Sequence, residues 1–370
     1  MARKEEKLST EKYYTATQWQ LMWRKFRKHK LATAAAGLLT VFYIVAIFCE
    51  FFSPYDTRKR FSDYTYCPPQ RIHFFGEKGK FHLRPFVYGI KRKFNQHTWR
   101  WVYINDKTEK YPIFFFVRGG QYKLWNLFRT DIHFFGVKEP GVIFLFGTNA
   151  VGMDLFSCNI YAARISLSIG LLGVALSFVL GCILGGISGY FGGTADMIIQ
   201  RIIEFLICIP TIPLWMALSA AVPDEWSPVK VYFGITVVLS FVGWCGLARD
   251  VRSKLLALRE EDFAMAAKIA GATYGRIIIR HLLPSFLSYL IVSLTLSVPG
   301  MILGETSLSF LGLGLRPPVV SWGVLLKEAQ NVQTVALHPW LLIPGLFVII
   351  VVLAFNFLGD GLRDAADPYK

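Results

Sequence analysis

The segment ISLSIGLLGVALSFVLGCILGGI, which occupies residues 165–187, contains no charged side chain. A helix needs about 20 mainly apolar residues to cross a hydrocarbon core of about 30 Å, so this segment predicts a transmembrane helix. Of the 370 residues, 54% are hydrophobic, which exceeds the roughly 45–50% expected of soluble domains. The chain is therefore predicted to be a membrane protein, with the lipid bilayer as a partner.

Other apolar runs of similar length occur on both sides of this segment. We predict six transmembrane helices in all, at residues 31–52, 165–187, 197–221, 231–248, 286–304 and 341–358. Pro210, Pro213 and Pro299 are expected to interrupt two of them. The run 31–52 is too long for the core of a signal peptide and has no small-residue cleavage site after it, so we expect a retained first helix.

The distribution of Lys and Arg predicts the orientation, because basic flanks resist translocation. Segments 1–30, 249–285 and 359–370 carry nine, seven and two basic residues, whereas 222–230 and 305–340 carry one and two. Both termini are therefore expected in the cytoplasm. The domain prediction is a basic amphipathic N-terminus (1–30), transmembrane helix 1 (31–52), an insertion (53–147), a five-helix core (148–358) and a cytoplasmic tail (359–370).

Most of the net charge of +15 is local to the insertion. Residues 57–147 contain 17 Lys and Arg and 6 Asp and Glu, a net charge of +11. Such a loop can still be exported, because the charge rule fails beyond about 60 residues. The alternation of Trp99, Trp101 and Tyr103 with other residues, and the run 113–117, predict strands. We expect a β-rich extracytoplasmic insertion and no nucleic-acid partner.

The insertion contains the pentapeptide IHFFG twice, at 72–76 and 132–136. It indicates either two similar hairpins or a chance match, since five letters are few for a repeat. His73 and His133 are expected to be structural. Glu204 follows Arg201 by three residues, which predicts a helical ion pair, and Glu50 is expected to reach water at the outer end of the first helix.

The six cysteines show no C-x-x-C pair and no His partner at zinc spacing, so no metal site is predicted. Only Cys67 and Cys158 could meet an oxidising compartment, and either a disulfide or two free thiols is possible. The phosphate-binding pattern G-x-x-x-x-G-K-[ST] is absent; the nearest string, Gly79-Lys80, is followed by Phe81. No catalytic residue or cofactor is predicted on this chain.

The segment EEDFAMAAKIAG (260–271), followed by HLLP (281–284), is amphipathic and rich in small residues. A helix of this kind, bounded by Gly271 and Pro284, could fit closely into a groove of a partner. Its A-A-x3-G and L-P spacing resembles the EAA loop of ABC importer permeases. The resemblance implies that 249–285 is a cytoplasmic coupling segment, with ATPase contacts at Met265, Ala266, Ala267, Gly271 and Pro284. Met265 stands where many members have Glu.

Further blocks are similar to the dipeptide/oligopeptide branch of that family, which has one helix before the common core. They are FGTN (146–149), YAARISL (161–167), GYFGG (189–193), ETSLSFLGLG (305–314), SWG (321–323) and FNFLGDGLRD (355–364). Members usually have Asp, Arg and Arg at the positions of Asn149, Met153 and Cys158. The resemblance implies an outer-mouth segment that includes Glu305, Ser309, Gly312, Gly314 and Trp322.

The resemblance further implies a type I importer-like helical core in a bacterial inner membrane. Its partners would be a homologous second permease, two ATPase subunits that hold ATP and Mg, and an extracytoplasmic solute-binding protein. Peptides are the expected cargo, while nickel, sugars and antibiotic peptides stay open, and no substrate-binding residue is predicted.

Two other classes of protein are considered. An ion-coupled secondary transporter would need intramembrane carboxylates or histidines as relays and often contains inverted repeats, and the sequence shows neither. A membrane-anchored binding or sensor protein acting through residues 57–147 would need one helix only, and five would be unexplained.

Overall fold

A computed structural model describes residues 18–75, 81–96, 99–125, 127–223 and 225–367. The chain divides into two compact units. Unit 1 holds the chain up to Thr40, Ile169–Gly304 and the part from Ile349 onward, and unit 2 holds Val41–Ser168 and Glu305–Val348.

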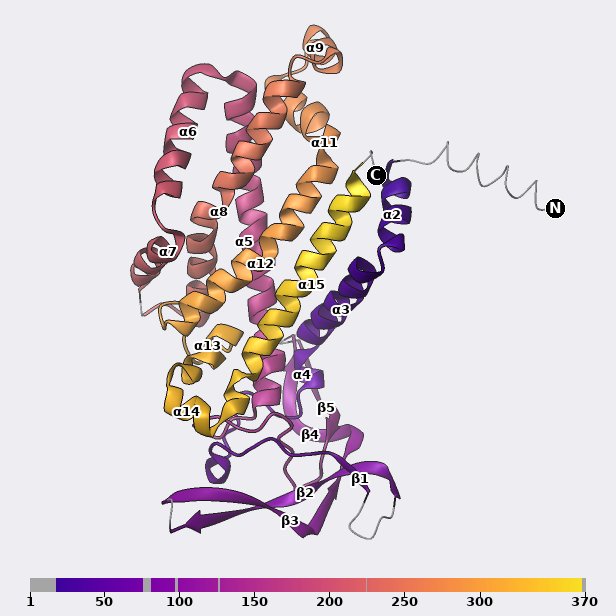
Figure 1. Cartoon of the computed structure of the whole chain (residues 1–370), viewed down its shortest axis with the longest axis vertical. Helices are drawn as coiled ribbons and strands as arrows, with labels where there is room; N and C mark the ends of the chain where they lie inside the picture. Colours follow the sequence, from indigo (N-terminus) through magenta and orange to yellow (C-terminus); the bar gives the residue numbers. More distant parts are fainter. Residues whose placement is uncertain (1–17, 76–80, 97–98, 126, 224, 368–370) are drawn as a thin grey trace, which may run out of the picture. The chain divides into compact units, whose positions relative to one another are not determined.

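The described part of the chain contains five helices that are long and apolar enough to span a membrane, or six if one bent pair counts as a span (Figure 1). The five are α3 (Lys30–Ile47), α5 (Leu155–Phe191), α8 (Pro228–Leu258), α12 (Leu287–Phe310) and the segment Pro339–Ala366, which includes α15 (Ile343–Ala366). The bent pair is α6 (Gly193–Cys208) and α7 (Thr211–Ala220). The prediction of a mainly helical membrane protein is confirmed.

Two of the prolines behave differently from each other. Helices α6 and α7 are separated by a two-residue break, and their axes differ by 92°. Pro210 lies in this break, and its missing N–H explains why the helix does not continue. The span expected at 197–221 is therefore two helices. An interruption was also expected at Pro299, and this was wrong: α12 continues through it.

Shorter helices link these elements. They are α2 (Gln18–Lys28), α4 (Cys49–Phe52), η1 (Ser62–Tyr64), α9 (Asp262–Ile269), α10 (Tyr274–Arg276), the π-helix η2 (Ile277–Leu282), α11 (Leu283–Ser285), α13 (Trp322–Leu326), η3 (Lys327–Gln330), α14 (Val332–Leu337) and η4 (Pro339–Leu342).

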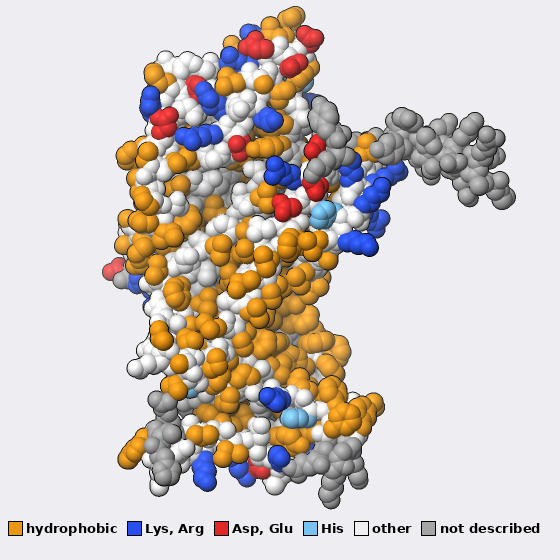
Figure 2. Space-filling view, viewed as in Figure 1, with side chains coloured by type: hydrophobic (Ala, Val, Ile, Leu, Met, Phe, Trp, Pro, Cys, Tyr) orange, Lys and Arg blue, Asp and Glu red, His pale blue; other side chains and the backbone are white. Residues whose placement is uncertain are grey.

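Within unit 1, glycines allow α5 and α8 to approach closely. A Cβ atom at Gly185 would lie 2.5 Å from the carbonyl oxygen of Ala248, and one at Gly189 would lie 2.7 Å from that of Arg252. Small residues four apart on one face let membrane helices pack backbone to backbone. Figure 2 shows acidic and basic side chains gathered at the end of unit 1 that carries α9, with mainly apolar side chains along the helices.

Unit 2 contains two antiparallel sheets in the insertion, where the sequence predicted strands. The first has the order β1 (His73–Phe75), β2 (Phe81–Asn95) and β3 (Arg100–Pro112), and the second pairs β4 (Phe114–Leu124) with β5 (Phe128–Gly136). The first copy of the repeated IHFFG pentapeptide contributes to the short edge strand β1, and its Gly76 lies outside the described residues. The second copy forms the end of β5.

Several single-residue predictions are decided by contacts within one unit. His133 is structural: its Nδ1 lies 2.6 Å from the carbonyl oxygen of Ser53 and its Nε2 3.0 Å from that of Gly120. Arg201 and Glu204 form the expected ion pair at 2.7 Å. Cys67 and Cys158 are both buried free thiols.

The expectation that Glu50 reaches water was wrong. Its side chain is buried and accepts two hydrogen bonds from Arg164, at 2.7 and 2.5 Å. Arg164 also donates to the carbonyl oxygens of Ala46 and Ile47, which end α3. A guanidinium is suited to this place because it satisfies helix-end carbonyls and a carboxylate together.

Candidate functional site

The segment between α8 and α12 forms a short helix that is seated on a buried cluster within unit 1. Helix α9 turns one face inward through Ala264, which is 3% exposed, and the half-buried Ala267. These residues are three apart and therefore share a face. Small side chains on that face allow α9 to lie close to its support.

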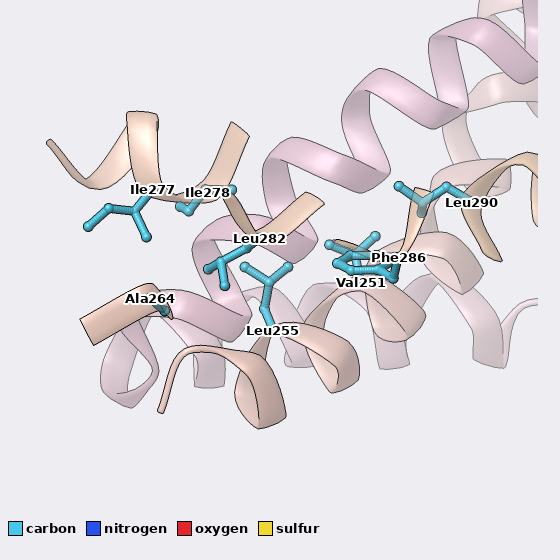
Figure 3. Packing of buried hydrophobic residues seen from close by; sticks show 8 residues of the cluster. All are labelled: Val251, Leu255, Ala264, Ile277, Ile278, Leu282, Phe286 and Leu290. Atoms are coloured by element: carbon cyan, nitrogen blue, oxygen red, sulfur yellow. The ribbon is translucent and has the colours of Figure 1, made fainter. Parts of the chain in front are cut away.

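Figure 3 shows the cluster that supports α9, in which side chains from α8, η2 and the start of α12 converge. Its members are Val251, Leu255, Ala264, Ile277, Ile278, Leu282, Phe286 and Leu290. Because most of these residues are fully buried, a displacement of α9 would disturb the packing of α8.

The other side of α9 is apolar and uncovered. Phe263, Met265 and Ile269 are exposed, and Ile269 reaches 85%. The predicted contact residues Ala266 and Gly271 are also exposed, whereas Ala267 is half-buried. Exposed apolar residues on a short helix are typical of a surface that a partner covers.

Gly271 ends α9 in the left-handed conformation, with φ of +79°. Its N–H donates to the carbonyl of Lys268 at 3.0 Å, and the N–H of Ala272 donates to that of Ala267 at 3.1 Å. This pair of bonds is the Schellman motif, which favours glycine at its left-handed residue. The sequence signal at Gly271 therefore has a backbone cause.

Pro284 lies in α11, two residues after the end of the π-helix η2, and is exposed. The N–H of Leu283 bonds to the carbonyl of Ile278, five residues earlier, so the turn is wider than an α-helix. Pro284 supplies no donor of its own. The predicted residues thus lie in α9, in the turn that follows it and in α11.

The glycine-rich turn 189–193 lies against the same segment, which sequence reasoning did not foresee. Arg259 donates to the carbonyl oxygens of Gly189 and Tyr190, at 3.4 and 3.2 Å. The Tyr274 ring contacts those of Tyr190 and Phe191, with centroids 5.7 and 5.4 Å away. In the sequence, Tyr274, three residues after Gly271, was the signal that could have suggested this contact.

A second link joins α6 to α8 beside this turn. Asp196 accepts two hydrogen bonds from Arg252, both at 2.5 Å, in the bidentate geometry that suits a guanidinium. Ser188 also donates to Asp196. Nothing in the local sequence pairs these residues, which are 56 positions apart.

The segment predicted as an outer mouth contains a buried carboxyl group within unit 2. Glu305 is fully buried and accepts hydrogen bonds from the hydroxyls of Ser166 (3.1 Å), Ser309 (2.8 Å) and Ser321 (2.6 Å). The Ser166 hydroxyl also accepts from the backbone N–H of Trp322, at 3.2 Å. The network connects α5, α12 and the start of α13.

The neighbouring predicted residues shape this network. Gly312 adopts φ of +81° just after α12 ends, and a Cβ atom at Gly314 would lie 2.5 Å from the Ser309 hydroxyl oxygen. Trp322 is fully buried, and its ring lies at right angles to that of Phe42, with centroids 6.5 Å apart. These positions serve packing in unit 2.

Asn149, which departs from the family pattern, contacts Glu328. Its amide Nδ2 donates to Glu328 Oε1 at 3.2 Å, and its Oδ1 accepts from the N–H groups of Val151 and Met153. Burial raises the pKa of Glu328 above its ordinary value. An aspartate at 149 would place a second carboxylate beside it.

Among the described residues, no group of three or more His, Cys, Asp or Glu side chains is arranged to hold a metal ion. The carboxyl groups discussed above bind serine hydroxyls, an amide or a guanidinium. These contacts hold packed side chains and helix ends in place.

The long apolar helices of the described residues are those of a multi-pass membrane protein, in which α9 offers an exposed apolar surface. Comparison with known proteins identifies the family. Residues 177–369 match the binding-protein-dependent transport system inner membrane component, and residues 17–69 match the N-terminal TM domain of oligopeptide transport permease C. The chain belongs to the first of these families. It is thus a non-catalytic, multi-pass inner-membrane permease subunit, and ATP is bound by the ATPase subunits of such transporters.

Curated relatives agree with this assignment. The dipeptide transport system permease protein DppC of Alkalihalophilus pseudofirmus is 40% identical over 233 residues, 63% of this chain and 74% of that protein. The oligopeptide transport system permease protein OppC of Haemophilus influenzae is 41% identical over 224 residues, 60% of this chain and 70% of that protein. A putative peptide permease of Brucella suis is 38% identical over 251 residues, which are 67% of this chain and 81% of that protein.

Among solved structures, an inward-facing MetNI methionine ABC transporter chain is similar, with a TM-score of 0.44 and 18% identity. The match covers 57% of this chain and 97% of that chain. A likeness of that size does not bear on cargo or partners.

Proposed function

We propose that this chain is the permease subunit of an importer for peptides, which a solute-binding protein delivers. Support for the cargo comes from the relatives, two of which are named as dipeptide and oligopeptide permeases. The exposed apolar side of α9 supports the mechanism, because a separate ATPase could seat on it. Two such ATPases and a homologous second permease would complete the transporter.

In this proposal, α9 transmits the movement of the ATPase to the helices. Ala264 and Ala267 rest on the cluster around Leu255 and Leu282, so a push on α9 reaches α8 through packed side chains. The bond between Arg259 and the turn at Gly189 carries the same push to α5. Coupling of this kind needs a contiguous packed route, and these contacts supply one within unit 1.

The proposed orientation places α9 and both termini in the cytoplasm. The basic counts support it, since 249–285 carries seven Lys and Arg and 305–340 carries two. The insertion 53–147 is then extracytoplasmic. It packs with the outer segment in unit 2, where the Tyr66 and His338 rings stack at 4.2 Å and Trp340 donates to the Thr148 carbonyl.

The test is to replace Gly271 in the complete transporter. A side chain would have open space there, but an L-residue in the left-handed conformation costs about 1–2 kcal/mol, so Gly271→Val should loosen the end of α9. We expect ATP-driven peptide uptake in proteoliposomes to fall several-fold while the complex still assembles. Asn tolerates this conformation better, so Gly271→Asn should retain more uptake.

Gly275→Ala is the matched control, because a Cβ atom at Gly275 also meets open space and its φ is not positive. It should transport normally. Normal uptake by Gly271→Val would remove the coupling assignment. Separately, a cysteine at exposed Lys268 should be protected from an impermeant thiol reagent in intact cells, and labelling from outside would reverse the orientation.

A further inference from the structure

The β4–β5 hairpin is attached to the end of the first transmembrane helix. The indole N–H of Trp125 donates to the carbonyl oxygen of Ile47, the last residue of α3, at 2.9 Å. The ring of Trp125 also lies 5.3 Å from that of Phe48. Farther along the strands, Phe116 and Phe134 contact Phe51 in α4.

This hydrogen bond holds the turn of the hairpin at the end of α3. Helix α3 is 18 residues long, so it is just long enough to cross the hydrocarbon core, and Ile47 ends it. Its last turn exposes Ile44 and Ile47. A tryptophan whose N–H meets the end of such a helix occupies the place where tryptophans gather at membrane interfaces.

The hairpin exposes several large apolar side chains close to the point where it meets α3. Leu127 is 73% exposed and Phe128 is 63% exposed, and Phe115, Phe116 and Ile132 are also exposed. The part of α3 that belongs to unit 2 also exposes Val41, Ile44 and Ile47. Figure 1 shows β4 and β5 beside α4, directly after the end of α3.

The charges of the hairpin also fit a lipid surface. Arg118, Lys123 and Arg129 are basic and exposed, while Asp131 is the hairpin's single acidic residue. Basic residues beside apolar ones favour anionic headgroups and can extend toward phosphates. The chemistry is that of an interfacial anchor, with apolar side chains at the acyl boundary and cations at headgroup level.

We propose that the β4–β5 hairpin inserts its turn into the membrane–water interface and continues the lipid-contacting surface of α3. The occupant of this surface is the phospholipid bilayer, and a docked protein is the competing explanation. The hairpin then fixes the insertion to the bilayer beside the end of α3. This inference does not depend on the cargo or on the coupling assignment.

The test measures spin-label accessibility in the assembled transporter in nanodiscs containing anionic phospholipid. Phe128→Cys is labelled in a Cys208→Ser parent, because Cys208 is the exposed native thiol. We expect the label to collide far more with oxygen, which partitions into lipid, than with a water-soluble nickel chelate. The matched control is Lys93→Cys on β2, because Lys93 is exposed and follows two other basic residues. A label at this position should collide more with the nickel chelate than with oxygen.

Leu127→Cys provides a second position whose side chain is largely free, should Phe128→Cys reduce assembly. The labelled parent without an added cysteine gives the background. A ratio of oxygen to nickel accessibility equal to that at Lys93 would overturn the proposal. So would nickel accessibility that falls only when the solute-binding protein is added, because that result would assign the surface to a protein partner.

Discussion

Replacement of Glu305 tests whether the buried serine network holds unit 2 together. In Glu305→Ala, the hydroxyls of Ser166, Ser309 and Ser321 lose their shared acceptor in a site without solvent. Glu305→Gln keeps the shape and one carbonyl oxygen. The two variants therefore separate the loss of both acceptor oxygens from the replacement of one of them by an NH₂ group.

The magnitude follows from the number of stranded donors. A buried unsatisfied polar group costs about 1–3 kcal/mol, and the truncation also leaves a cavity, so Glu305→Ala should cost about 3–5 kcal/mol. In Glu305→Gln, the amide oxygen can still accept from Ser309 and Ser321. Its NH₂ must then donate to Ser166, which has a lone pair left beside the Trp322 N–H, so the cost is about 1 kcal/mol.

The assay is thermal unfolding of the assembled transporter in nanodiscs, followed by loss of peptide-stimulated ATP hydrolysis after heating. We expect the order wild type, Glu305→Gln, Glu305→Ala from most to least stable. Thr306→Val is the control, because the Thr306 hydroxyl is buried with no hydrogen-bond partner among the described residues and its loss should be neutral or stabilising. Equal stability of the Ala and Gln variants would refute the network argument.

Two other predictions concern carboxyl groups outside the membrane-spanning helices. Asn149→Asp should destabilise by about 1–3 kcal/mol at neutral pH, since it sets two carboxylates side by side, and adding Glu328→Gln should restore the stability; an unchanged single variant would contradict this. Burial raises the pKa of Asp154 from 3.8 to about 6, so folding favours its protonated form. Stability should therefore fall by up to about 3 kcal/mol as pH rises through this range. Asp154→Asn should remove that slope, and an identical slope would count against it.

Much of the fold was predictable because a span needs only local composition. The run at 165–187 and its counterparts predicted spans that the structure places at similar positions, and alternating residues around Trp101 predicted β3. The break at Pro210 was also predictable, since proline's missing N–H is a local property. Continuity through Pro299 was not, because neighbouring helices can accommodate a proline.

The sequence by itself determined the membrane class, the number of apolar runs and the glycine-bounded helix at 260–271, because each depends on residues close together in the chain. Only the tertiary structure decided that Glu50 is buried beneath Arg164, that Asp196 meets Arg252, and that three serines from separate segments converge on Glu305. Those partners lie up to 139 residues apart. A charge or hydroxyl in a sequence does not specify its partner. Once the group is buried, however, it must find a hydrogen-bond partner, because an unpaired buried polar group costs free energy.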